Sequence, residues 1–179
     1  MGLNVMSDVV DVPAEAPDRF AIRFAQPTDV PTVLGFVHKL AEYEHLSHEV
    51  QLDEAALYKL LFGARPYAEV VLAELGGRAI GFALFFHTVS TFAGKPGIHL
   101  EDLFVDPQAR GKGYGKALMA HLAHLAVERG CARFEWAVLN WNEPSIAFYQ
   151  QLGAKPLDTW HVYRLSGAAL DALGGKSVP

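Results

Sequence analysis

Three basic residues and three glycines, closely spaced after an apolar segment, could together bind a phosphate group. The basic residues are Arg110, Lys112 and Lys116, and the glycines lie at 111, 113 and 115. From Lys116 onward apolar residues recur with helical spacing, so the glycines should lead into a helix. The first N–H groups of a helix have no internal partner and attract anions. The sequence therefore predicts a site for a phosphate or pyrophosphate.

The spacing of these glycines excludes two common nucleotide loops. A Walker loop has four residues between its first glycine and a Gly-Lys pair, followed by Ser or Thr. Here only three residues separate Gly111 from Gly115-Lys116, and Ala117 has no hydroxyl. The dinucleotide fingerprint Gly-x-Gly-x-x-Gly is also absent, because these glycines alternate. An ordinary glycine-rich surface turn with solvated lysines remains the alternative.

Possible acid and base groups lie on either side of this loop. Glu101 and Asp102 are in the strand that precedes it, and strict alternation would direct them to opposite faces. Downstream, Asn142 can cap a helix that carries Phe148 and Tyr149. Each carboxylate could equally be solvated, and an aromatic residue on such a helix often belongs to the core.

Two motifs in this order resemble the GCN5-related N-acetyltransferases. They are Arg110-x-x-Gly113-x-Gly115 and Asn142-x-x-Ser145-x-x-Phe148-Tyr149, and the resemblance extends from about Phe20 to Leu165. Three further segments resemble the spermidine/spermine (diamine) branch of that family. These segments are Leu40-Ala-Glu-Tyr-Glu44, Leu100-Glu-Asp102 and Trp141-Asn-Glu-Pro-Ser-Ile-Ala-Phe-Tyr149.

The resemblance implies acetyl-CoA as the cosubstrate and direct attack of an amine on its thioester. It implies Glu101 as the base, Tyr149 as the acid, and an amine site formed by Tyr43, Glu44, Glu101 and Asp102. The residues that it assigns to CoA are Leu103, Phe104, Val105, Arg110, Gly111, Lys112, Gly113, Tyr114, Gly115, Lys116, Asn142 and Ser145. It further implies a small-molecule amine substrate and a homodimer.

The sequence departs from the polyamine-specific enzymes at two places. Ser90 stands where those enzymes have an acidic residue, and the segment Asp158-Thr-Trp160 is shorter than their acidic one. The Ser-Thr-aromatic run that starts at Ser90 is more similar to the sister branch that acetylates thialysine. We therefore expect short or lysine-like amines in preference to long polyamines. A protein or peptide N-acetyltransferase and a non-catalytic CoA-binding sensor remain alternatives.

The segments that must position these residues alternate between the apolar spacing of a strand and that of a helix. We expect strands over 20–24, 67–75, 79–89, 132–139 and 161–165, a further strand leading into the loop, and a two-glycine turn at Gly76-Gly77. Thr28 or Asp29, Asp53 and Asn142 are expected to cap helices. The order predicts an α/β (α+β) fold, a mixed and largely antiparallel sheet with helices on both faces. We expect one domain over 20–170, with a flexible tail over 1–19 and a C-terminal tail over 171–179.

Composition excludes several other classes of protein. The net charge of −5 argues against general binding of nucleic acid or membrane surfaces. With one cysteine, and with His45/His48 and His121/His124 lacking a third ligand, we expect no metal. The sequence carries neither a secretion signal nor an apolar run of membrane-spanning length, which predicts a cytoplasmic protein.

Overall fold

The computed structural model describes residues 19–175. Most of the expected N-terminal tail, residues 1–18, and the last residues of the C-terminal one, 176–179, lie outside this range. The chain divides into two compact units, one up to Ala137 and one from Val138. The first unit contains the sheet and three long helices, and the second contains α4 (Glu143–Gln151) and α5 (Gly167–Gly174).

In the described residues, five strands form one sheet in the order β1-β2-β3-β4-β5. Their bounds are Phe20–Phe24, Glu69–Leu75, Arg78–Ser90, Lys95–Val105 and Phe134–Trp136. Neighbouring strands are antiparallel except for β4 and β5, which are parallel. Gly76 and Gly77 both have positive φ in the tight turn between β2 and β3, as the sequence predicted. The mixed, largely antiparallel sheet is confirmed.

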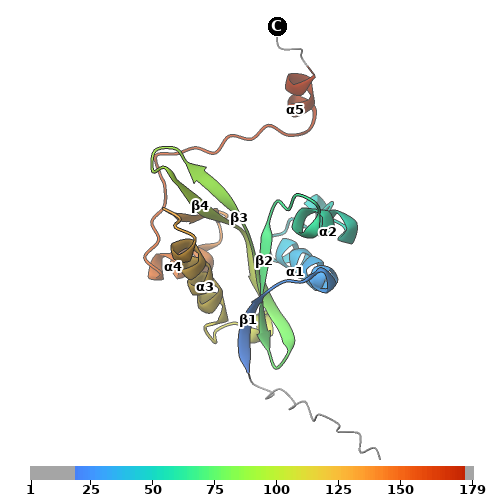
Figure 1. The fold of residues 1–179 in the computed structure, drawn as a ribbon, viewed down its shortest axis with the longest axis vertical. Coiled ribbons are helices and arrows are strands. Elements are labelled where there is room, and N and C mark those ends of the chain that lie inside the picture. The colour runs from blue at the N-terminus through green and yellow to red at the C-terminus, as the bar shows by residue number, and fades with distance from the viewer. Residues whose placement is uncertain (1–18, 176–179) are drawn as a thin grey trace, which may run out of the picture. The chain divides into compact units, whose positions relative to one another are not determined.

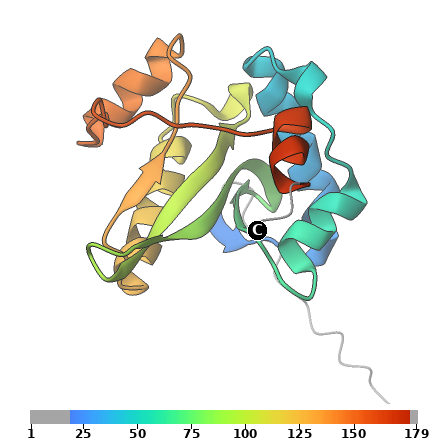
Figure 2. The same cartoon turned by 90° about the horizontal axis from the view of Figure 1, so that it is seen from above.

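Helices cover both faces of this sheet. α1 (Val30–Tyr43) and α2 (Glu54–Phe62) lie on one face, and α3 (Tyr114–Glu128) lies on the other (Figures 1 and 2). The side chain of Asp53 accepts a hydrogen bond from the Ala56 amide, which confirms its predicted role as a cap. In the 3-10 turn Pro27–Asp29 before α1, Asp29 forms a capping box with Gln26, and its side chain makes no hydrogen bond that caps α1 itself. No described helix has the length and apolar character that a membrane crossing requires.

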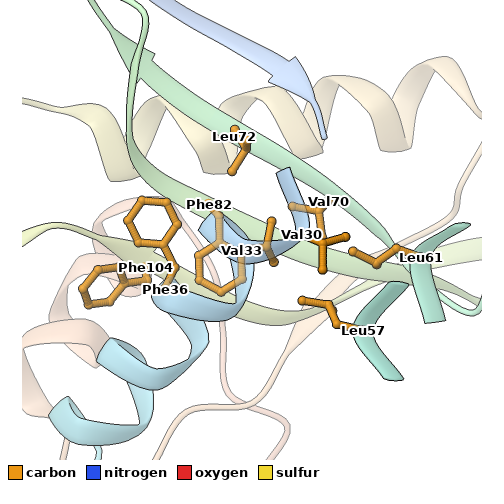
Figure 3. Packing of buried hydrophobic residues seen from close by; sticks show 9 residues of the cluster. All are labelled: Val30, Val33, Phe36, Leu57, Leu61, Val70, Leu72, Phe82 and Phe104. Carbon is orange, nitrogen blue, oxygen red and sulfur yellow. The ribbon is translucent and has the colours of Figure 1, made fainter. Parts of the chain in front are cut away.

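The core between α1 and the sheet is aromatic at one end and aliphatic at the other (Figure 3). Phe36 of α1 stacks on Phe82 of β3, with 5.7 Å between ring centroids, and contacts Phe104 of β4 at 5.8 Å. Leu57 and Leu61 of α2 complete this cluster on its outer side. Full burial of one such side chain contributes about 2–3 kcal/mol to folding. Phe104 therefore anchors the last residues of β4 firmly against α1.

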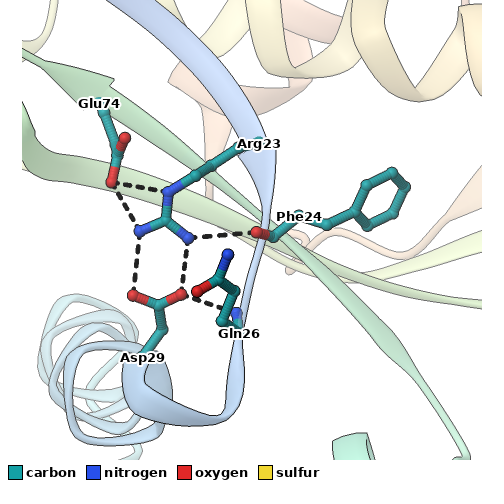
Figure 4. Close-up of polar contacts among 5 residues, drawn as sticks. All are labelled: Arg23, Phe24, Gln26, Asp29 and Glu74. Atoms are coloured by element: carbon teal, nitrogen blue, oxygen red, sulfur yellow. Dashed lines mark hydrogen bonds and ion pairs between the residues drawn. The ribbon is translucent and has the colours of Figure 1, made fainter.

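An ion-pair network joins the start of α1 to the sheet (Figure 4). Arg23 of β1 binds Asp29 through both terminal nitrogens, at 2.6 and 3.0 Å, and binds Glu74 of β2 through Nε and one terminal nitrogen. Hydrogen bonding to Arg23 lowers the pKa of the Asp29 carboxyl. This network fixes the direction in which the chain leaves β1 and enters α1.

The C-terminal part differs from the sequence expectation in three ways. Residues 161–165 form no strand, so that prediction was wrong. The strand expected over 132–139 is shortened to Phe134–Trp136. α5 was not predicted, because glycines flank its short apolar run and it crosses the expected domain boundary at 170. A strand needs a hydrogen-bonded neighbour, and apolar alternation alone does not provide one.

Candidate active site

The centre of the candidate site is a bulge in β4. Leu84 of β3 pairs with Asp102 and Phe85 pairs with Leu100, so Glu101 is an extra residue without a partner across the β3–β4 pair. A bulge bends its strand and breaks the simple alternation of side chains. The sequence prediction of two carboxylates on opposite faces assumed a regular strand, and it therefore does not describe this point. Bulges are common beside active sites because they redirect single side chains.

One edge of β4 loses its neighbouring strand at the same place. β5 pairs with β4 only from Ile98 to Leu100, where the register ends at Trp136. From Glu101 to Val105, β3 is therefore the only pairing neighbour of β4 among the strands that the structure describes. Backbone N–H and C=O groups along such an edge can bind an extended ligand as a further strand would.

Two of the carboxylates that the sequence assigned to the amine site, Glu44 and Glu101, affect the third, Asp102. Burial, together with the nearby negative charges of Glu101 and Glu44, raises the pKa of Asp102 to about 6. Burial also raises the pKa of Glu44. Glu101 is more open, with 57% of its side chain exposed, and its Oε2 lies 3.9 Å from Nε2 of His99. Such a cluster favours a positively charged ligand, because a cation would relieve the repulsion.

Glu44 and Tyr43 are held at the C-terminal end of α1. The amide of Leu46 donates to the carbonyl of Ala41 and the amide of His45 donates to Glu42, which closes the last turn. His45 has φ of 61°, the left-handed conformation that glycine usually adopts at this position. The helix thus ends abruptly, with Tyr43 and Glu44 in its last turn.

The glycine loop has the backbone geometry expected of an anion site. After the short 3-10 turn Pro107–Ala109, Gly111 and Gly113 have φ of 76° and 87°, and a Cβ on either would meet open space. Gly113 precedes the first turn of α3 and has no side chain to cap it. The first intrahelical bond in this region runs from the Ala117 amide to the Gly113 carbonyl, so the preceding amides of α3 have no earlier helical carbonyl to bond.

The side chains of this loop are directed differently from one another. Lys112 and Lys116 are exposed, whereas the ring of Tyr114 stacks on Phe20 with 4.8 Å between centroids. Arg110 lies on the α1 side, where its guanidinium carbon is 4.9 Å from the ring centroid of Tyr43. The motif predicts the backbone of the loop but does not indicate where its arginine points.

A hollow of about 370 Å³ lies beside this arginine, between the end of α1 and the end of β4. Its lining includes Lys39 and Glu42 of α1 together with Asp106 and Pro107. Nζ of Lys39 is 3.3 Å from Oδ2 of Asp106. Sequence reasoning missed these residues. The spacing of Lys39 and Tyr43, one helical turn apart, was a signal that they share a face.

The remaining predicted residues belong to the second unit and lie on or just before α4. The side chain of Asn142 is buried and its Oδ1 accepts a hydrogen bond from the Ser145 amide at 3.3 Å, which confirms the predicted cap. Tyr149 is half-buried next to Phe148, with 5.3 Å between ring centroids. Asn142, Ser145 and Tyr149 therefore share one short helix, and the cap orients its first turn.

No group of three or more His, Cys, Asp or Glu side chains in the described part of the chain could hold a metal ion. Burial and the neighbouring His124 lower the pKa of His121, which favours its neutral form.

Comparison with known proteins decides the family. The model of the acetyltransferase (GNAT) family matches residues 36–154, a range that includes the end of α1, the bulge, the glycine loop and α4. The chain belongs to the GNAT acetyltransferases.

Individual relatives of this GNAT enzyme act on amines, according to their names. It is 36% identical to a thialysine N-epsilon-acetyltransferase of Sus scrofa, over 87% of this chain and 97% of the relative. It is 32% identical to an L-ornithine N5-acetyltransferase of Arabidopsis thaliana, over 85% of this chain and 86% of the relative. Among solved structures, an integron cassette protein from the mobile metagenome of V. cholerae aligns with a TM-score of 0.75 and 26% identity. That alignment covers 88% of this chain and 98% of the other.

Proposed function

We propose that this GNAT acetyltransferase transfers the acetyl group of acetyl-CoA to the primary amine of a small cationic substrate. The substrate class is a lysine-like amine such as thialysine, or a short di- or polyamine. The observation that carries the proposal is the cluster of Glu44, Glu101 and Asp102 beside the open edge of β4. Carboxylates that suit an amine and a strand edge that suits an extended thioester ligand together support this proposal.

The donor side fits the chemistry of CoA in two respects. The pyrophosphate needs N–H donors and little steric bulk, which the backbone from Gly111 to Lys116 offers at the start of α3. The pantetheine arm is an extended chain with two amide groups, and the backbone of Leu103, Phe104 and Val105 on the open edge of β4 can pair with it. Asn142 and Ser145 are proposed as further contacts of CoA.

The acceptor side must remove a proton before the amine can react. An alkylamine has a pKa of about 10, so it arrives as an ammonium ion at neutral pH. Asp102 and Glu44 attract this ion, and Tyr43 forms a wall of the site. Glu101, the exposed residue of the bulge, accepts its proton directly or through water.

The neutral amine then attacks the thioester carbonyl carbon. The new C–N bond forms and the C–S bond breaks, so that CoA leaves as a thiolate. We propose that the hydroxyl of Tyr149 donates the proton that this sulfur accepts. No covalent acyl-enzyme intermediate is required.

The choice of amine is supported by the relatives and by two places at which the sequence departs from the polyamine-specific enzymes. Thialysine and ornithine, named for the relatives, are amino acids with a terminal primary amine. Ser90 is not acidic and the segment before Trp160 is short, with Asp158 as its acidic residue, so fewer carboxylates are available for the distal ammonium ions of a long polyamine. We therefore expect thialysine, lysine and ornithine to be better substrates than spermine.

The decisive experiment is an acetyl-transfer screen with the purified full chain and acetyl-CoA. The panel comprises thialysine, ornithine, lysine, short diamines, spermidine, spermine and a lysine-containing peptide. Turnover of the small amines supports the proposal. Turnover of the peptide alone would point to a protein acetyltransferase. CoA binding without turnover of any amine would point to a sensor.

We further propose that the enzyme is a homodimer. Trp160, Val162 and Tyr163 are 73%, 93% and 92% exposed, an unusual exposure for three large apolar side chains so close in sequence. Exposed apolar clusters commonly mark protein interfaces.

A further inference from the structure

The arginine of the glycine loop and the tyrosine of the amine site form one contact. The Arg110 guanidinium carbon lies 4.9 Å from the ring centroid of Tyr43 and 5.5 Å from that of Phe104. Both distances lie within the range of a cation–π contact. The arginine that the motif would assign to CoA thus rests between two aromatic rings on the α1 side of β4.

A hydrogen bond fixes the same arginine to the strand. Nε of Arg110 donates to the carbonyl oxygen of Val105 at 2.9 Å. The side chain therefore closes the turn between the end of β4 and the glycine loop, and its planar face remains for the two rings. Lysine could not replace this arrangement, because it has neither the Nε donor in that position nor a planar group.

The loop needs such an anchor because its glycines have no side chains that could hold it in one conformation. Gly111 and Gly113 both adopt positive φ and have no side chains that could pack. Glycine loses more conformational entropy on ordering than any other residue, so a rigid loop requires restraint from outside. Phe104 is held in the core by Phe36, and Tyr43 is held at the closed end of α1.

We infer that Tyr43 is a positioning residue for the donor loop, acting through Arg110, in addition to its place at the amine site. This inference rests on the proposed function, because it concerns how the loop binds CoA. Arg110 orders the loop so that the backbone amides of α3 face the pyrophosphate, and Tyr43 provides the surface on which Arg110 stacks. The end of α1 then serves both substrates, with Glu44 on the amine side and Tyr43 on the CoA side.

The test measures the affinity for CoA by titration calorimetry with no amine present. Tyr43→Leu removes the ring and should weaken CoA binding about three- to tenfold. Tyr43→Phe keeps the ring and should bind CoA like the wild type. Tyr67→Leu removes an exposed tyrosine of the same unit and is the matched control, with unchanged affinity. Melting temperatures confirm that each variant is folded.

A double-mutant cycle then tests whether Tyr43 acts through Arg110. Arg110→Lys should itself weaken CoA binding at least as much as Tyr43→Leu does. In the Arg110→Lys background, Tyr43→Leu should cost little more, because the contact is already lost. If Tyr43→Leu does not fold, Tyr43→Met, which also removes the ring but keeps more apolar bulk, takes its place in the cycle with the same expected result.

Two outcomes would overturn the inference while leaving the proposed function intact. One is an unchanged CoA affinity in Tyr43→Leu with a raised KM for the amine, which would confine Tyr43 to the amine site. The other is additive losses in the cycle. A wild-type enzyme that fails to bind CoA at all would instead refute the proposed function.

Discussion

At the scale of the residue, burial distinguishes carboxylates that sequence reasoning treated alike. Asp102 is sheltered beside Glu44 and Glu101, and its pKa is raised to about 6, whereas Glu101 is largely exposed on the bulge. A sheltered carboxylate is suited to binding a cation, and an exposed one can exchange its proton with water. This difference in exposure between Asp102 and Glu101 follows from the bulge, which no residue type in the sequence predicts.

Asp102→Asn should make the enzyme more stable at neutral pH and less active. The pKa of Asp102 rises from 3.8 to about 6 on folding, so the folded state binds its proton more tightly than the unfolded state does. Stability therefore falls as the pH rises from about 4 to about 6, by about 3 kcal/mol in total. The neutral amide avoids this loss. Urea unfolding should give the variant a higher free energy of unfolding than the wild type at pH 7.5, and this gain should disappear near pH 4. An equal gain at both pH values would contradict the raised pKa of Asp102.

Tyr149→Phe should reduce turnover by about a hundredfold or more while leaving the affinity for CoA unchanged. Loss of a general acid has this order of effect, and the ring that packs against Phe148 is retained. Tyr58→Phe removes a hydroxyl from an exposed tyrosine on α2 and serves as the control. Steady-state rates and CoA titration give the two readouts. Full turnover in Tyr149→Phe would require another proton donor.

At the scale of the element, local signals predicted most of the fold. The capping residues Asp53 and Asn142, the two-glycine turn and the glycine loop all act within a few residues, and the structure has each of them. Features that depend on distant neighbours were missed. They include the bulge at Glu101, which depends on pairing with β3, and the direction of Arg110, which depends on α1. The strand expected over 161–165 had the right residue types but no neighbouring strand in the described part of the chain.

The two ends of α3 offer a matched test of the glycine loop. Gly113 before the helix and Gly130 after it have φ of 87° and 68°, and a Cβ on either would meet open space. Replacement of either by alanine should cost about 1–2 kcal/mol of stability because of the left-handed backbone. Only Gly113→Ala should also weaken CoA binding, since it distorts the proposed phosphate site. Equal effects on CoA affinity would place the anion site elsewhere.

At the scale of the whole molecule, the second unit exposes side chains that a monomer would ordinarily bury. Trp160, Val162 and Tyr163 lie in a segment without regular secondary structure, and α5 adds exposed Leu170 and Leu173. A second copy of the chain would give these side chains an apolar surface to contact.

Light scattering after gel filtration should therefore report the mass of two chains. Val162→Asp introduces a charge into the exposed segment and should shift the protein towards the monomer. Val127→Asp, at a valine of α3 that is 78% exposed, is the control and should leave the mass unchanged. A wild-type monomer would contradict the proposed dimer and would remove the explanation for the exposed segment.

The short pairing between β4 and β5 also has a consequence for local opening. β3 pairs with β2 from Arg78 to Phe85 and with β4 from Gly81 to Ser90, whereas β5 is joined to β4 only from Ile98 to Leu100. Strands with few hydrogen bonds open at lower free energy than the global unfolding reaction. The amides of β5 should consequently exchange with deuterium much faster than those of β3. If CoA occupies the free edge of β4, its binding should slow exchange there, so the cosubstrate would complete a sheet that the chain leaves unfinished.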